Sequence, residues 1–565
     1  MKRYLSVLLS CLGYSLLAQD LTTLSQQKPL TFHGGITMRT MFYHAEGIAN
    51  RRQPFSYLIT GSPTLSLYGF SIPFTFIVSE QERSFRQPFN QFGLSPSYKW
   101  ITLHGGYRNV SFSPFTLDGY TMLGGGVELR PGKWHIGLMY GRLNRAVVAN
   151  QSLGDLQAVS FNRRGVAGKI GYGSDTTHVE FSFIKAKDNA ASVDYQNIGQ
   201  DTLGVVPVTP AENLVMSLGG RVGLLKYFFV EAEGAVSIYT KNIRSSMAID
   251  STVAHIPAWL PALMTINSST ENNKALRGAI GYRQKKYGFS LQYRRIDPNY
   301  QSMGAYFFQN DLENITLNPM ALLWQGKIRF NGSLGIQRDN LSGQKQATAR
   351  RVIGSLNASL ALSGRFGIEM AYSNFATSQT PIAVKFNDSL RVAQTTQNFS
   401  FTPHYFILGT SRNHVFTLSV NYMTLNDLSL LSQQRNVHST NAFFNYQITF
   451  QATGLNLSAG LSYARLQTAM LTSGNQGLTL GVGKSLLHSK LTLRLNSSIL
   501  QNLQGTAQTM LYTNGLSGSY RATKRHSLNL TVNYIQNQES AESQQAGGYP
   551  TFTEVRGDVG YNFTF

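Results

Sequence analysis

The feature that most constrains this sequence is a period-two alternation of apolar and polar residues, repeated in strand-length segments from about residue 30 to the C-terminus. In residues 455–463, for example, Leu455, Leu457 and Leu461 alternate with small polar residues. Residues 528–534 repeat the pattern. Because successive side chains of a β-strand point to opposite faces, each segment predicts a strand with one apolar and one polar face.

Composition places these strands in a membrane. Only 14% of the residues are charged, against about 25% in typical soluble proteins, while the chain holds 52 Gly, 28 Tyr and 33 Phe. Beyond the N-terminal segment there is no apolar stretch of about 18 residues, so a transmembrane helix is excluded and only a closed barrel can span.

We therefore predict an all-β fold, a single transmembrane antiparallel β-barrel of about 26 strands (range 22–26) over residues 31–565. Short turns would face the periplasm and long loops the outside. Residues 19–30 would form a short periplasmic segment, too short for an N-terminal plug domain, so loops or a partner would have to fill the lumen. Tyr and Phe cluster at the ends of the predicted strands, as expected for the two membrane interfaces of a barrel. A soluble sandwich or propeller is the alternative fold, since aromatic residues also end strands in those folds.

Residues 1–18 have the pattern of a cleaved secretory signal peptide. Basic Lys2 and Arg3 precede an apolar run, and Ala18 is followed by polar residues. The only cysteine, Cys11, lies within this segment, where lipidation is the alternative interpretation. Cleavage after Ala18 would leave a mature chain without disulfides, thiol catalysis or cysteine-ligated metal.

The last eight residues close the chain with the same alternation. Asp558, Gly560, Phe563 and Phe565 supply a polar residue, a glycine and two aromatic residues, the last at the C-terminus. In this the chain resembles the large outer-membrane β-barrel proteins of Gram-negative bacteria, whose C-terminal signal is recognised for assembly. The motif points to no narrower family, and an ordinary edge strand is the alternative.

The resemblance implies a location and partners. The protein is expected in the bacterial outer membrane, exported through its signal peptide and inserted by the barrel assembly machinery. Its partners would be outer-membrane lipids and lipopolysaccharide, together with an envelope protein partner or plug.

Short turns are predicted to alternate with long polar connections. The tight turns lie at 131–133, 173–175, 285–288, 363–365, 409–413, 452–454, 487–489 and 523–525. The long connections lie near 144–164, 188–212, 241–272, 298–314, 374–395, 426–437 and 537–550.

Motifs for catalysis, metal and cofactors are lacking in the sequence. There is no HExxH motif, phosphate loop, nucleophile elbow or His cluster, so we expect no enzyme activity, cofactor or metal. Adjacent His–Ser residues occur at 438–439, 488–489 and 526–527, but neighbours on a strand point to opposite faces. A barrel hydrolase would need a Ser, a His and an acid gathered at one strand end.

The formal net charge of +21 calls for anionic partners. Nucleic acid is not expected, because no recognition-helix, zinc-knuckle or RNA-binding pattern occurs. Three arginine pairs near strand ends are candidates for pore-mouth or lipid-phosphate contacts: Arg163 and Arg164, Arg294 and Arg295, and Arg350 and Arg351. Ordinary snorkelling at the membrane interface is the alternative interpretation.

Two loop segments are unusually apolar. The first is a candidate partner-binding or plug loop and comprises Ile256, Pro257, Trp259, Leu260, Pro261, Leu263 and Met264. The second, residues 300–323, is a candidate infolded or partner-facing loop with Tyr300, Met303, Tyr306, Phe307, Phe308 and Met320. Packing on neighbouring loops is the alternative for the first segment.

Two functions fit these observations. The first is a porin-like or partner-gated transport conduit that favours anionic cargo, which predicts Arg and Lys side chains in the lumen. The second is an occluded structural or assembly component of an outer-membrane complex that binds partners through its long loops. It predicts an apolar loop surface and no conductance.

Overall fold

The computed structural model describes residues 29–80, 88, 90–147, 160–193, 208–249, 257–305, 310–344, 347–381, 392–427, 436–504, 507–539 and 551–565. The predicted signal segment 1–18 lies outside the described residues. Strands account for 72% of the chain. Within the described residues, no helix combines the length and the apolar character needed to cross a membrane.

The strands of the N-terminal half are β1 (Leu30–His33), β2 (Gly35–Glu46), β3 (Phe55–Gly61), β4 (Thr64–Leu67), β5 (Phe70–Ser79), β6 (Gln91–Leu94), β7 (Ser97–Tyr98), β8 (Ile101–Asn109), β9 (Thr121–Leu129), β10 (Trp134–Asn144), β11 (Arg163–Gly173), β12 (His178–Asp188), β13 (Glu212–Leu224), β14 (Phe228–Thr240), β15 (Thr270–Arg283) and β16 (Tyr287–Ile296). Three short helical segments occur in the described connections: η3 (Ala190–Ser192), α3 (Leu260–Leu263) and η4 (Trp324–Gly326).

The strands of the C-terminal half are β17 (Leu312–Leu323), β18 (Ile328–Arg338), β19 (Ala347–Ala361), β20 (Phe366–Pro381), β21 (Val392–Leu408), β22 (Arg412–Asp427), β23 (Val437–Phe450), β24 (Leu455–Thr468), β25 (Thr472–Leu486), β26 (Leu491–Gln504), β27 (Ala507–Arg521), β28 (His526–Glu539) and β29 (Phe552–Thr564).

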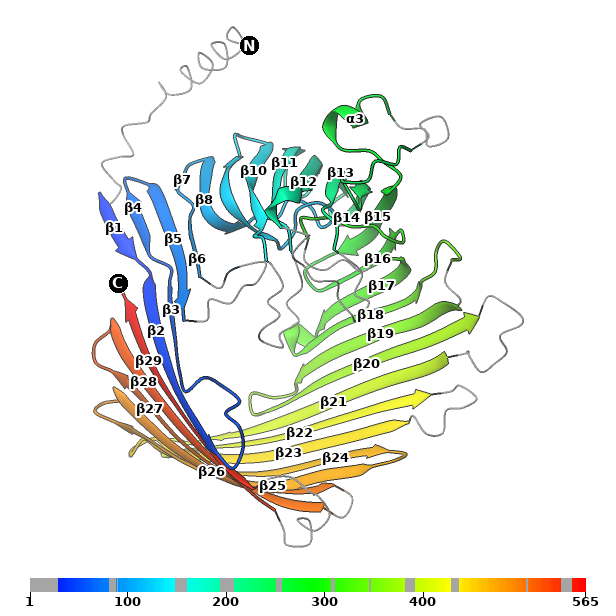
Figure 1. Ribbon diagram of the computed structural model, residues 1–565. Coiled ribbons are helices and arrows are strands. Elements are labelled where there is room, and N and C mark those ends of the chain that lie inside the picture. Colours follow the sequence, from blue (N-terminus) through cyan, green and yellow to red (C-terminus); the bar gives the residue numbers. More distant parts are fainter. Residues whose placement is uncertain are drawn as a thin grey trace.

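These segments form one closed antiparallel barrel (Figure 1). The 29 segments make 26 barrel strands, because β1 continues into β2, β3 into β4, and β6 into β7 across short irregularities. Closure occurs between β2 and β29, which pair from Gly35 opposite Thr564 to Glu46 opposite Thr553. The predicted fold class and strand number are confirmed, and the soluble sandwich and propeller alternatives are wrong.

The seam between β2 and β29 also carries ion pairs on its inner face. The Arg39 guanidinium donates to the Asp558 carboxylate from Nη2 at 2.8 Å and from Nε at 3.1 Å. Arg556 approaches the other Asp558 oxygen from Nε at 2.9 Å. Nearby, the Tyr43 hydroxyl donates to Glu554 at 3.0 Å, and Arg51 pairs with the same carboxylate. Side chains thus join the chain ends across the seam, in addition to the backbone ladder.

The outward face of the barrel carries a continuous row of exposed apolar side chains. On six successive strands the row includes Leu461, Leu480, Leu495, Leu516, Leu530 and Val559, all of them exposed. Water would make such a surface costly, whereas lipid tails make it favourable. The barrel therefore has the architecture of outer-membrane β-barrels.

The inner wall has two unlike halves. From β19 to β28 many of the inward positions carry Asn, Ser and Thr, including Ser355, Asn357, Asn398, Ser400, Asn421, Asn445, Ser462, Asn475, Asn496, Thr513, Thr531 and Asn533. Every buried apolar side chain among the described residues falls between Tyr43 and Leu312. The apolar core of the protein thus lies on one side of the ring.

Short connections, including all eight predicted tight turns, lie at one end of the barrel, here called the turn rim. Two other short turns there, at 225–227 and 324–327, lack a clear sequence signal, because Leu225 and Trp324 adopt positive φ in place of the usual Gly or Asn. The predicted strict alternation of short and long connections is wrong at the opposite end, the loop rim. There, the connection between Thr468 and Thr472 is short as well.

The seam gives a first testable prediction. Asp558→Asn removes the carboxylate that Arg39 and Arg556 share, so the folded barrel should lose about 1–3 kcal/mol in its free energy of unfolding. Urea unfolding in lipid vesicles, followed by tryptophan fluorescence, measures this loss. Asn562→Ala on the same face of β29 removes only uncharged hydrogen bonds, to Thr37 and Ser527, and should stay within about 1 kcal/mol of the unsubstituted protein. Equal stability of the Asp558→Asn variant and the unsubstituted protein would contradict a stabilising seam.

Candidate functional site

Two loops from the loop rim fold into the barrel. One comprises residues 110–120, between β8 and β9, and the other the described residues 297–305, which follow β16. Phe115, Leu117 and Tyr300 are fully buried, in one apolar cluster with inward residues of β9 to β17 such as Met139 and Ile184. We call residues 110–120 and the described residues 297–305 the lumenal loop pair.

The two loops bind each other directly. The Tyr300 hydroxyl donates to the Phe115 carbonyl at 3.0 Å, and the Asp118 amide donates to the Gly304 carbonyl at 3.0 Å. The Ser302 hydroxyl donates to the Thr116 carbonyl. Burial and the Glu233 carboxylate raise the pKa of the Tyr300 hydroxyl, which therefore stays protonated as a donor.

Polar side chains on β12, β13 and β14 fix the loop pair to the wall. Asn213 accepts from the Met303 amide at 3.0 Å and donates to Ser237 at 3.0 Å. Ser237 in turn donates to the carbonyl of Gln301 at 2.6 Å. The Glu233 carboxylate accepts from Ser217 on the wall and from Ser113 of the loop. A buried carboxylate and a buried amide thus tie both loops to one side of the barrel.

Glycines give the loops room to approach. A Cβ on Gly137 of β10 would lie 2.6 Å from the Phe112 ring, and one on Gly304 would lie 2.8 Å from the Thr116 carbonyl oxygen. A Cβ on Gly124, the first of three consecutive glycines, would meet the backbone of β10 instead. The glycine triplet therefore lets the backbones of β9 and β10 approach closely, which agrees with its position within a strand pattern.

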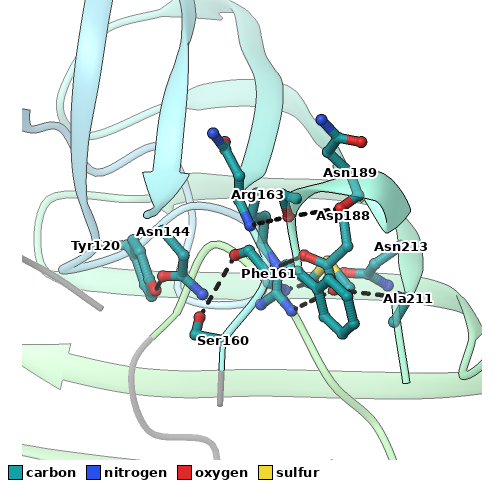
Figure 2. A network of polar contacts seen from close by, with 12 residues as sticks. Tyr120, Asn144, Ser160, Phe161, Arg163, Asp188, Asn189, Ala211 and Asn213 are labelled. Carbon is teal, nitrogen blue, oxygen red and sulfur yellow. Dashed lines mark hydrogen bonds and ion pairs between the residues drawn. The ribbon is translucent and has the colours of Figure 1, made fainter. Parts of the chain in front are cut away.

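A polar network closes the wall beside the loop pair, at the loop rim (Figure 2). Arg163 makes two hydrogen bonds to Asp188, at 2.8 Å and 3.0 Å, and Asp188 also accepts from the Ala211 amide at 3.0 Å. The Tyr120 hydroxyl donates to Asn144 at the end of the infolded loop. Arg163 is therefore a neutralised structural cation, with its side chain directed inward.

The three arginine pairs divide between the two faces. Arg164 is exposed on the outward face, Arg295 faces Leu276 of the apolar band, and Arg350 faces the outward Arg338. The other members, Arg163, Arg294 and Arg351, point inward, as the alternation of a strand requires. Pore-mouth contact therefore stays a prediction for the inward three and lipid-phosphate contact for the outward three.

Several lumenal cations are matched by carboxylates. The pairs are Arg163 with Asp188, Lys169 with Glu180, Arg277 with Glu231 and Glu233, Arg221 with Glu231, and Arg39 with Asp558. Arginine and lysine side chains do line the lumen, but the chain's net charge overstates the positive charge that they leave uncompensated there.

A Ser–His–Glu contact lies near the turn rim. His104 is within 2.8 Å of the Ser95 hydroxyl through Nδ1 and within 3.1 Å of Glu128 through Nε2. The neighbouring cavity of about 330 Å³ is lined by Glu128 and His135, not by Ser95 or His104. The serine is thus not presented to that space, and the cluster joins three strands as a structural contact.

A second histidine, His135, bonds Glu180 at 3.2 Å in the same region. Among the described residues, no three His, Cys, Asp or Glu side chains gather in a geometry that suits a metal ion.

The predicted partner or plug loop lies on the outer wall. Leu260 and Met264 pack on Leu214 and Ile238, which belong to the outward face of β13 and β14. Figure 1 shows α3 outside the ring of strands. Trp259 and Leu263 stay 48% and 45% exposed, so an apolar surface remains for lipid or a partner. Ile256 lies outside the described residues, and a partner role for this segment stays a prediction.

The second apolar loop lies in the lumen, through Tyr300 and Met303. Tyr306, Phe307 and Phe308 lie outside the described residues, and Met320 belongs to strand β17. Residues 110–120 also enter the lumen, although the sequence pattern did not predict it. Phe112, Phe115 and Leu117 are spaced irregularly there, and an apolar run of that kind between two strand patterns was the available signal.

Three of the assembly-signal residues lie on β29 with the predicted alternation, and Phe565 follows directly after the strand. Asp558 and Gly560 face the lumen side of the seam, and Phe563 faces outward beside His526. The Phe565 ring stacks on Phe32 at 4.0 Å between ring centroids. Recognition of these residues by assembly machinery stays a prediction.

Comparisons with known proteins assign no function to the chain. The sequence matches no family model and no curated protein. It is similar in structure to the FrpB iron transporter from Neisseria meningitidis, with 11% identity, 97% of this chain and 83% of that chain covered, and a TM-score of 0.38. It is also similar to the P pilus usher (PapC) translocation pore, with 9% identity, 95% of this chain and 99% of that chain covered, and a TM-score of 0.35. The outer membrane protein OprD from Pseudomonas aeruginosa shares 10% identity, with 63% of this chain and 89% of that chain covered and a TM-score of 0.29.

Detaching the loop pair tests the site. Gly304→Val would place side-chain atoms against the Thr116 carbonyl and Ile184, so we expect residues 110–120 and 297–305 to be cleaved several-fold faster in limited proteolysis. Mass spectrometry of the released peptides measures the change. Gly364→Ala, in a turn with open space around its Cβ, is the matched control and should leave the cleavage rate unchanged. Unchanged cleavage in Gly304→Val would contradict the tethering of the two loops.

Proposed function

We propose that the protein is a transport conduit of the bacterial outer membrane, with a lumen narrowed on one side by the lumenal loop pair and a preference for anionic cargo. The observation that carries this proposal is the division of the inner wall. One half anchors the loops through a buried core, and the other, from β19 to β28, is lined mainly by small uncharged polar side chains, with few charges such as Arg351.

The uncharged half suits passage of hydrophilic solutes. Amide and hydroxyl groups exchange hydrogen bonds with water at little cost, and they bind no ion tightly enough to hold it. A ring of 26 strands is wide, since barrels of 16–18 strands already enclose an aqueous channel. The loop pair then acts as a constriction, tethered to the other half.

The proposed anion preference has a narrower basis. Arg294 and Arg351 point into the lumen, and no carboxylate partner is found for either among the described residues. The field of such residues would raise the local concentration of anions and repel cations. It acts in addition to the matched ion pairs, whose fields largely cancel.

Planar-bilayer conductance of the refolded barrel tests the proposal. We expect stepwise currents with an anion-selective reversal potential in a KCl gradient, and larger or noisier steps for Gly304→Val because its loops are released. Arg351→Gln should shift the reversal potential toward zero, while the outward neighbour Arg350→Gln should leave it unchanged. The proposal would be contradicted if the folded, unsubstituted barrel and the folded Gly304→Val variant both failed to conduct. A cation-selective current would contradict it as well.

The second candidate function is an occluded structural or assembly component. The exposed Trp259 and Leu263 on the outer wall favour it, since apolar side chains at the edge of a membrane band can bind another envelope protein. A silent barrel that co-purifies with an envelope protein, and loses it with Trp259→Ala, would support this function over the first.

A further inference from the structure

A cavity of about 730 Å³ lies on the inner wall, on the turn-rim side of the lumenal loop pair. Its walls come from β13 to β18, and Pro114 and Phe115 of the loop pair form its cover. Four of the lining side chains are arginines: Arg221, Arg277, Arg283 and Arg294. We call this space the arginine cleft. Its size is that of a pocket for a small organic molecule.

The charges in the cleft do not balance. Arg277 lies 2.8 Å from Glu233 and 3.4 Å from Glu231, and Glu231 is also 3.8 Å from Arg221. No carboxylate pairs with Arg283 or Arg294 in the described part of the chain. Four guanidinium groups therefore share two carboxylates, one of which, Glu233, also accepts hydrogen bonds from Ser113 of the loop and Ser217 of the wall.

The arrangement of the strands makes the unmatched charge costly. Arg277 of β15 and Arg294 of β16 are directly opposite in the antiparallel register, on the same inner face. Like charges at such positions destabilise a sheet. The Nε of Arg221 is also buried without an acceptor. An anion bound between these groups would relieve both the repulsion and the missing hydrogen bond.

The other lining groups indicate what kind of anion fits. Guanidinium groups bind planar oxyanions through paired hydrogen bonds, and Gln292, Asn314 and Asn318 add amide donors on the neighbouring strands. Phe229, which lies under Arg221 with 4.4 Å between ring centroid and guanidinium carbon, joins Phe115 in giving the cleft an apolar side. A small inorganic ion would leave that side unfilled.

We propose that the arginine cleft is a binding site for small organic anions that carry carboxylate groups on an apolar body, with Arg294 as the principal anion ligand. The site deepens the proposed conduit function, on which it rests for the route by which a solute reaches it. The carboxylates are held by Arg294, Arg283 and the amides, and the apolar body lies against Phe229 and Phe115.

Isothermal titration calorimetry of the folded barrel in detergent tests the site without any need for conductance. The probe is phthalate, which has two carboxylates on one ring. We expect saturable binding that weakens as salt is added, and at least about a tenfold loss of affinity in Arg294→Gln, the loss of a charged hydrogen bond. The matched control is Arg295→Gln, the outward neighbour, which should bind phthalate within about twofold of the unsubstituted protein.

Circular dichroism and the heat-dependent gel mobility of each variant establish that it is folded. Absence of phthalate binding in the folded, unsubstituted barrel would overturn the inference, as would equal losses in Arg294→Gln and Arg295→Gln. Tighter binding of inorganic phosphate than of phthalate would overturn the assignment to a carboxylate with an apolar body. Binding by a barrel that is silent in the bilayer would retain the site and refute the conduit, whereas conductance without binding would do the reverse.

Discussion

The structure depends on the pairing of β2 with β29. In a lipid environment each unpaired backbone amide or carbonyl is costly, so a sheet is tolerated only when its first and last strands meet. The register from Gly35–Thr564 to Glu46–Thr553 completes the ring, and Arg39 and Asp558 add an inward ion pair at the same place. Closure also fixes which side chains face lipid and which face the lumen, because the alternation of every strand is then locked in phase.

A closed ring of this size leaves an interior that side chains of the wall alone cannot fill. The protein fills part of it with two loops, which bring Phe115, Leu117 and Tyr300 into contact with small or apolar residues of the wall. Glycines such as Gly137 give up side-chain volume so that the loops can approach. The consequence is an asymmetric lumen, with a packed half from β9 to β17 and a hydrophilic half from β19 to β28.

Charge follows the same division. Apart from those at the β2–β29 seam, the inward ion pairs lie in the packed half, because a buried carboxylate is tolerated only with a partner, as Asp188 beside Arg163 illustrates. The hydrophilic half needs few charges, since water and amide groups satisfy one another. The arginine cleft lies within the packed half, on the turn-rim side of the loops, and there Arg294 faces Arg277 with no carboxylate partner among the described residues. That imbalance separates a binding surface from a purely structural network.

The sequence by itself determined the architecture. Alternation such as that of residues 455–463 and the scarcity of charge require lipid-facing strands. Both can be seen in the sequence without knowing which strands pair in the fold. The tight turns at 131–133 and 363–365 could be predicted for the same reason, from their local turn residues. The turn at Leu225 could not be predicted, because the paired strands impose its positive φ on a residue that does not favour it.

Only the tertiary structure decided the site. Adjacent arginines look equivalent in sequence, and the phase of each strand sends Arg294 inward and Arg295 outward. The segment 256–264 was a candidate plug or partner loop by composition, yet its described residues pack on the outer wall. Residues 110–120 enter the lumen, although no sequence pattern predicted it. Such contacts join residues far apart in the chain, as Phe115 and Tyr300 are, and no local pattern encodes the partner of a long-range contact.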